Sequence, residues 1–128
     1  MKKTKLKKQS SLPIARLKQK LDKIFSIFIR NRGKGICFTC GLKRTPKLMQ
    51  CGHFISRTHS STRWNDINCQ SQCFACNIWK RGNIAEFSAR LIEKYGMEEF
   101  KNLIAEGRKI KQWKISELEE LIKKYEDN

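Results

Sequence analysis

Acidic residues and long apolar stretches are both scarce in this sequence. Its 128 residues include 12 Asp and Glu against 28 Lys and Arg, which gives a formal charge of +16. No apolar run is long enough to cross a bilayer, and charged residues interrupt the segment that would have to serve as a secretory signal. We therefore expect no membrane span and a cytoplasmic location, where paired cysteines are metal ligands more often than disulfides.

The positive charge is concentrated in the first two thirds of the chain. Residues 1–36 carry 12 basic and one acidic side chains, residues 37–92 carry 8 and 2, and residues 93–128 carry 8 and 9. This distribution predicts a polyanionic partner, DNA or RNA, whose phosphates the cations neutralise. A solvated lysine-rich surface and an anionic membrane surface are the alternatives. A protein-interaction adaptor has no use for so much charge.

Histidine is rare as well, but cysteine is not. Two C-x-x-C pairs, Cys37/Cys40 and Cys73/Cys76, have the spacing that lets four thiolates reach one tetrahedral zinc ion at about 2.3 Å. Four thiolates leave no open coordination position, so we expect a structural Zn²⁺. Redox dithiols and disulfides are the alternative roles for these pairs. Of the other two cysteines, Cys51 and Cys69, we expect reduced, partly buried thiols.

The sequence predicts four segments. Residues 1–12 form a basic disordered tail, 13–33 an amphipathic helix, 34–95 the four-cysteine core and 96–128 a C-terminal helical extension. The apolar face of the first helix, with Phe25 and Phe28, either packs within the chain or pairs with a second copy in a homodimer. We expect short strands over residues 48–56 and 67–72, and helices over 84–95, 98–106 and 116–125.

His53 lies in the first predicted strand, where alternation places it on the same face as Cys51. Asn68 lies five residues before Cys73, the first cysteine of the second pair, and Asn77 directly follows Cys76, the second cysteine of that pair. This layout resembles the HNH, or ββα-metal (His-Me finger), nuclease fold. The resemblance implies a small zinc-stabilised α+β domain with flanking helices, in which a histidine deprotonates water beside one divalent cation.

A narrower resemblance rests on a longer pattern. Cys51-Gly52-His53-Phe54, Arg63-Trp64-Asn65 before Asn68, Gln72-Cys73-x-x-Cys76-Asn77 and Gly82-Asn83 before a helix are similar to the NinG/Rap family of phage recombination proteins. The family resemblance implies an endonuclease that hydrolyses branched or recombination-intermediate DNA, of the Holliday-junction or D-loop type, with Mg²⁺ or Mn²⁺. It makes His53 the general base, Asn68 its orienting partner and Asn77 a ligand of the catalytic ion. Phage or host recombination proteins are further expected partners.

One position departs from this pattern, because Gly52 stands where many HNH sites have a second metal ligand. Gln50, Cys51, His59 and Asp66 are the nearby replacements. If none serves, the site is degenerate and the protein is a non-catalytic zinc-stabilised DNA- or RNA-binding module. Either way, the residues expected to contact nucleic acid are Arg57, Arg63, Trp64, Lys80 and Arg81. Trp64 can instead be a core anchor. The four basic residues can instead be solvated charges.

Overall fold

The structure is a computed structural model and describes residues 2–126, with side chains from Pro13 onwards. The chain divides into two compact units. One consists of Met1–Phe28 with Trp113–Asn128, and the other is Ile29–Gln112. Among residues 2–126, no helix is long and apolar enough to cross a membrane.

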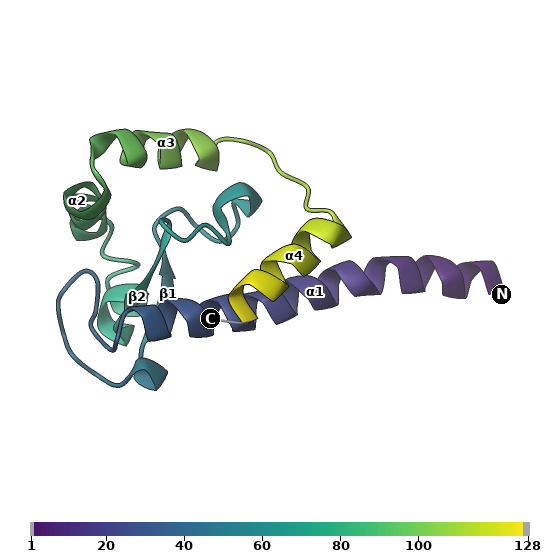
Figure 1. Cartoon of the computed structure of the whole chain (residues 1–128), viewed down its shortest axis with the longest axis horizontal. Coiled ribbons are helices and arrows are strands. Elements are labelled where there is room, and N and C mark those ends of the chain that lie inside the picture. The colour runs from purple at the N-terminus through teal and green to yellow at the C-terminus, as the bar shows by residue number, and fades with distance from the viewer. Residues whose placement is uncertain (1, 127–128) are drawn as a thin grey trace. The chain divides into compact units, whose positions relative to one another are not determined.

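The first unit is built from two helices, α1 (Lys2–Arg32), whose last four residues belong to the other unit, and α4 (Ile115–Glu126), which lies beside it (Figure 1). Phe25 is 1% exposed, and its ring meets that of Tyr125 edge to face with centroids 4.9 Å apart. Phe28 contacts the same tyrosine ring at 4.8 Å. The Phe25/Phe28 face therefore packs within the chain, the first of the two alternatives left open by the sequence.

Helix α1 begins earlier than the sequence predicts. Its backbone is helical from Lys2, and so over residues 2–12 of the segment expected to be a disordered tail, and Pro13 lies inside it. Lysine, leucine and glutamine in this segment are good helix formers. A proline removes one backbone hydrogen bond and strains the preceding turn, but here it does not end the helix.

A two-stranded antiparallel sheet lies at the centre of the second unit. Strands β1 (Gln50–His53) and β2 (Cys69–Gln72) pair with His53 opposite Cys69 and Gln50 opposite Gln72. Side chains alternate between faces, so Cys51, His53, Cys69 and Ser71 share one face, and Gln50, Gly52, Gln70 and Gln72 share the other. The first of these groups is called the His53 face below, and the second the glutamine face.

Both strands are shorter than predicted, and Asn68 explains where the pairing ends. Phe54 still donates its N–H to the Asn68 carbonyl at 2.9 Å, but the next donor, the Ile55 N–H, goes to the Asn68 side-chain oxygen at 2.7 Å. A side chain thus takes the place of the next ladder bond, and the backbone turns away into the following loop.

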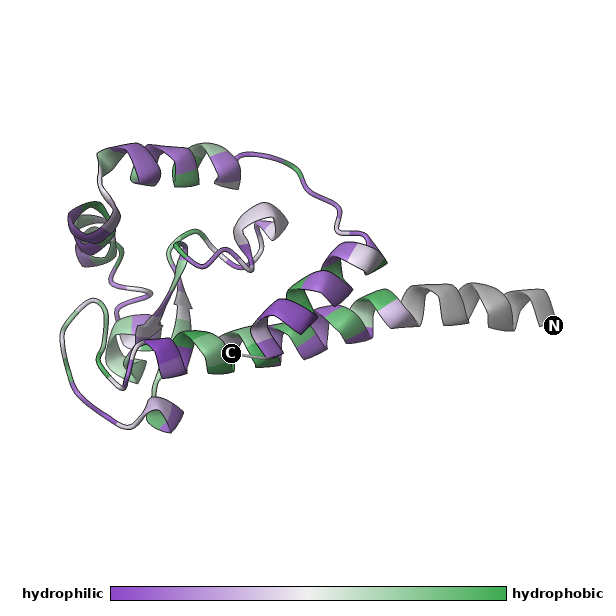
Figure 2. Cartoon of the chain, in the orientation of Figure 1, coloured by the Kyte–Doolittle hydropathy of each residue, from purple (hydrophilic) through white to green (hydrophobic). Residues whose placement is uncertain are grey.

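Helices α2 (Ile84–Tyr95) and α3 (Met97–Gly107) cover a small apolar core. Phe87, Leu91 and Leu103 are its buried members, and the rings of Phe54 and Phe87 lie 5.5 Å apart. Figure 2 shows green and purple residues sharing helix α3, as expected for an amphipathic helix. Because α3 contributes Leu103 to this core, the compact unit continues to Gln112, beyond the boundary that the sequence places after residue 95.

The architecture confirms a small mixed α+β protein with helices at both ends. The first cysteine pair follows α1, and the second lies between β2 and a five-residue π-helix, η3 (Ala75–Trp79). Helix η3 begins two residues after Cys73 and contains Cys76, and its i→i+5 hydrogen bonds make it wider than an α-helix. Lys80 N–H closes it on the Ala75 carbonyl at 2.9 Å.

Candidate metal centre and active site

The two C-x-x-C pairs meet in space. The sulfur atoms of Cys37, Cys40, Cys73 and Cys76 all lie within 4.8 Å of one another, and those of Cys40 and Cys73 are 3.7 Å apart. Two thiolates bound to zinc at about 2.3 Å with tetrahedral angles are separated by roughly 3.8 Å. The cluster could therefore hold a metal ion such as zinc, and four sulfur donors suit that ion.

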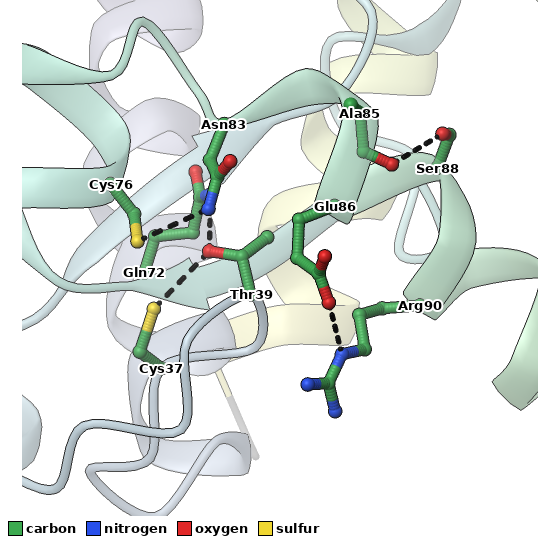
Figure 3. Close-up of polar contacts among 9 residues, drawn as sticks. All are labelled: Cys37, Thr39, Gln72, Cys76, Asn83, Ala85, Glu86, Ser88 and Arg90. Carbon is green, nitrogen blue, oxygen red and sulfur yellow. Dashed lines mark hydrogen bonds and ion pairs between the residues drawn. The ribbon is translucent and has the colours of Figure 1, made fainter.

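Hydrogen bonds from neighbouring groups fix these thiols. Gln72 Nε2 donates to Thr39 Oγ1 at 3.1 Å, so the threonine hydroxyl is oriented to donate to Cys37 Sγ at 3.3 Å. Asn83 Nδ2 donates to Cys76 Sγ at 3.6 Å. Figure 3 shows Thr39 lying between Cys37 and Gln72, with Asn83 directed at Cys76. Donors aimed at sulfur stabilise the thiolate form that binds metal.

The thiols differ in how readily they ionise without a cation. Burial opposes ionisation of Cys37, but hydrogen bonds from the Thr39 hydroxyl and from nearby backbone N–H groups outweigh it and lower its pKa to about 6. Burial raises the pKa of Cys73. One thiolate thus forms easily while another is disfavoured, and a bound cation is what would allow all four to ionise together.

His53 ends β1 and is oriented by a backbone carbonyl. Its Nε2 lies 2.9 Å from the carbonyl oxygen of Arg63. A carbonyl oxygen only accepts hydrogen bonds, so Nε2 carries the proton and Nδ1 carries the lone pair of the neutral ring. A neutral ring held in this tautomer can act as a general base through Nδ1.

Asn68, the predicted orienting partner of His53, acts one step away from the ring. It is fully buried, and its Nδ2 donates to the carbonyls of Ile55 and Thr62, both at 3.1 Å. These bonds tie the segment after β1 to the segment that carries Arg63. Asn68 thereby positions the carbonyl that holds His53, and the sequence could not reveal this because a backbone group has no side-chain signature.

Asn77 lies with the glutamine face. Its Nδ2 donates to Gln50 Oε1 at 2.7 Å, at the opposite end of β1 from His53. Gln50 and His53 are three residue steps apart along the strand, which is roughly 10 Å. The structure therefore pairs the Asn77 side chain with that of Gln50.

The unusual Gly52 has a steric cause. A Cβ placed at this position would lie 2.6 Å from Cδ of Gln72, far inside contact distance. The Gln72 amide is fixed there, because its Nε2 donates to the Gly82 carbonyl at 2.9 Å as well as to Thr39. Gln72 therefore fills the space that a metal-binding side chain at position 52 would occupy.

A second group of metal-type ligands lies on the His53 face. Cys51, His53 and Cys69 each place one ligand atom within 4.8 Å of the other two. Burial raises the pKa of Cys69 well above its usual value, and the nearby Cys51 thiol raises it further. From the sequence we expect reduced, partly buried thiols at Cys51 and Cys69, not metal ligands. Cys69 lies close to Cys51 and His53 only because of the register in which β2 pairs with β1. A local sequence motif does not reveal that register.

Among the residues expected to contact nucleic acid, Trp64 is buried. It is 5% exposed, which favours its interpretation as a core anchor over that of a base-stacking platform, and the guanidinium of Arg63 lies 4.9 Å from its ring centroid. Arg57, Lys80 and Arg81 are exposed. The large exposed aromatic is instead Trp79, at 76%, edge to face with Phe74. In the sequence, the position of Trp79 between Asn77 and the basic pair Lys80-Arg81 could have marked it as a residue that contacts nucleic acid.

Fold and site together define a small α+β protein with a cysteine cluster that could hold zinc and a histidine at the end of a two-stranded sheet. No solved structure matches the chain. The chain belongs to the NinG family of phage proteins, because the family model described as Bacteriophage Lambda NinG protein matches residues 1–128.

Individual relatives agree with this assignment. Protein ninG of Escherichia phage lambda is 27% identical over 126 residues, covering 97% of this chain and 61% of that protein. Protein ninG of Escherichia phage 933W is 26% identical over the same length, and that of Salmonella phage P22 is 28% identical over 97 residues, 74% of this chain and 47% of the relative. The chain thus spans about three fifths of the length of the phage lambda and 933W relatives.

Proposed function

We propose that this protein is a structure-selective DNA endonuclease that hydrolyses phosphodiesters in branched recombination intermediates such as Holliday junctions or D-loops. The observation that carries the proposal is the hydrogen bond between His53 Nε2 and the Arg63 carbonyl. Membership of the NinG family, the charge of +16 and the resemblance of the hairpin to HNH nucleases support it.

His53 supplies the base. With Nε2–H held by Arg63, the Nδ1 lone pair can remove a proton from a water molecule as that water attacks phosphorus. Asn68 keeps the Arg63 carbonyl in place through its bonds to Ile55 and Thr62. A positioned general base contributes about 10²–10⁴-fold to a rate, so this arrangement accounts for a substantial part of catalysis but not all of it.

The four-cysteine cluster has a structural role in this proposal. Zinc bound by Cys37, Cys40, Cys73 and Cys76 would cross-link the loop after α1 to the segment after β2, and its closed coordination leaves catalysis to other groups. Met49 and Ala75 pack against the thiols, so the cluster is also a small core of its own. A unit of this size benefits from such a cross-link.

The expected Mg²⁺ or Mn²⁺ finds a poor fit among these residues. Gln50 and Asn77 offer neutral carboxamide oxygens, whereas Mg²⁺ is usually held through carboxylates and substrate phosphates. Gly52 adds no ligand. This observation favours a second candidate function, in which the protein binds branched DNA or RNA without cutting it and acts beside phage or host recombination proteins.

The DNA-binding surface proposed here combines charge with one aromatic platform. Lys80 and Arg81 are exposed directly after η3, and Trp79 presents most of its indole to solvent. Cations hold the phosphate backbone, and an exposed indole stacks on an unpaired base. This surface therefore suits DNA that exposes an unpaired base better than a continuous duplex.

Cleavage of a labelled four-way junction and of a matched linear duplex separates the two functions. With Mg²⁺ or Mn²⁺ the nuclease should cut the junction in preference to the duplex, and EDTA should stop it. Tight binding without cutting under any divalent ion would reject the nuclease and leave the binding module. Weak, salt-insensitive binding would contradict both.

A further inference from the structure

The Cys51, Cys69 and His53 side chains form a cluster that the proposed hydrolysis does not use. Their ligand atoms lie within 4.8 Å of one another on the His53 face. Cross-strand pairing puts His53 directly opposite Cys69, and Cys51 is two residues before His53 on the same face. Two hydrogen-bonded strands therefore hold all three groups, which is a firmer scaffold than a loop.

The ligand types of Cys51, His53 and Cys69 favour one class of metal ion. Two thiolates and one imidazole are ligands for zinc and other borderline-soft cations, and they are poor ligands for Mg²⁺. With Zn–S near 2.3 Å and Zn–N near 2.0 Å, tetrahedral ligand atoms lie roughly 3.5–3.8 Å apart. Closing the present cluster around zinc needs a movement of about 1 Å or less. Three protein ligands leave the fourth position to water.

The orientation of His53 also suits a metal ligand. Metal-binding histidines usually donate their other ring N–H to a carboxylate or a backbone carbonyl, which fixes the tautomer. His53 donates Nε2–H to the Arg63 carbonyl, and the Cys69 thiol donates to the same oxygen at 3.6 Å. A metal ion bound by the ring takes up a nitrogen lone pair, and the proposed base requires such a lone pair.

We propose that Cys51, His53 and Cys69 form a second zinc site, separate from the four-cysteine cluster, and that zinc bound there occupies the His53 lone pair and stops DNA cleavage. The regulatory half rests on the proposed nuclease. The binding half does not, because it requires only that the reduced chain take a second equivalent of zinc.

Zinc stoichiometry tests the binding half on the whole chain. Reduced protein loaded with zinc and freed of excess should contain two equivalents, released in two steps by a graded chromophoric chelator. Cys51→Ser, Cys69→Ser and His53→Gln should each lose one equivalent. His59→Gln, a change at the other and exposed histidine, should keep two. Circular dichroism checks that each variant is folded.

Cobalt provides a second readout that does not depend on the variants. Loading the wild-type chain with Co²⁺ should give two sequential absorption changes, both with thiolate-to-metal bands, the first from four thiolates and the second weaker from two. A single equivalent of zinc or cobalt in folded wild type overturns the second site. Two equivalents in all three cluster variants overturn it as well.

The regulatory half is measured by junction cleavage in Mg²⁺ at one and at two zinc equivalents. The second equivalent should abolish cleavage by wild type, and Cys51→Ser should be far less sensitive to it. Cleavage that is unchanged by the second equivalent overturns the regulation. A chain that never cuts defeats the proposed nuclease and the regulation with it, while the stoichiometry still decides whether the site exists.

Discussion

At the scale of single residues, Gly52 is a position that leaves no room for a side chain. Gly52→Ala would drive a methyl group into the Gln72 amide, whose bonds to Thr39 and Gly82 support the cysteine cluster. Overpacking of this kind typically costs about 1–3 kcal/mol. We expect a loss of that size in the free energy of unfolding, measured by urea denaturation of the zinc-loaded protein.

A double-mutant cycle shows whether the clash is the cause. Gln72→Ala removes the amide and makes room, so adding Gly52→Ala in that background should cost much less than it does in wild type. Equal costs in the two backgrounds would mean that Gly52 is required for another reason.

Trp79 carries a residue-scale prediction about DNA. Base–aromatic stacking is worth about 1–3 kcal/mol per base, so Trp79→Ala should weaken binding to a junction or single strand by that amount, measured by fluorescence anisotropy. The slope of affinity against salt should stay the same because no charge is removed. Ile110→Ala, at a position 98% exposed, is the control. Wild-type affinity in Trp79→Ala would exclude the indole from the interface.

Individual site residues could be foreseen only where their side chains carry the signal. The four cysteines and His53 stand out by type and spacing. The Arg63 carbonyl does not, because any residue offers one, and the contacts of Asn68 follow from it. Trp64 and Trp79 illustrate a further limit, since both lie among basic residues in the sequence and only burial distinguishes them.

At the scale of elements, the packing of α1 against α4 can be tested by substitutions on α1. Phe25 is buried against Tyr125, whereas Ile27 on the same helix is 50% exposed. Phe25→Ala should lower the free energy of unfolding by about 3–5 kcal/mol, and Ile27→Ala by less than about 0.5 kcal/mol. Thermal and urea denaturation measure both. Similar small effects for the two variants would contradict the packing described here.

The elements themselves were foreseen where periodicity is strong. Helix α2 has the bounds that its apolar spacing predicts, and α3 and α4 differ by a residue or so at each end. The ends of the strands and the type of helix η3 were harder to predict from the sequence. Asn68 ends the ladder through its side chain, a contact that local propensity does not show, and η3 is a π-helix, a rare form that residue periodicity does not distinguish from an α-helix.

At the scale of the whole molecule, the charge of +16 predicts steep salt dependence of DNA binding. Each phosphate contact contributes about 0.9 to the slope of log affinity against log salt on duplex DNA. Replacing Lys80 and Arg81 by alanine should reduce the slope by up to about 1.8. Lys109→Ala, which removes a cation paired with Glu106 at 3.0 Å, should leave it nearly unchanged. Equal slopes for all proteins would remove the Lys80–Arg81 surface from the interface.

The central claim is that His53 is the base of a DNA endonuclease, and one comparison tests it most directly. Wild type, His53→Ala and His59→Ala, each with one equivalent of zinc and equal junction affinity, are assayed for cleavage of a four-way junction in Mg²⁺ and Mn²⁺. Cleavage should fall by at least about 100-fold in His53→Ala and persist in His59→Ala. Cleavage by His53→Ala at the wild-type rate would contradict the account.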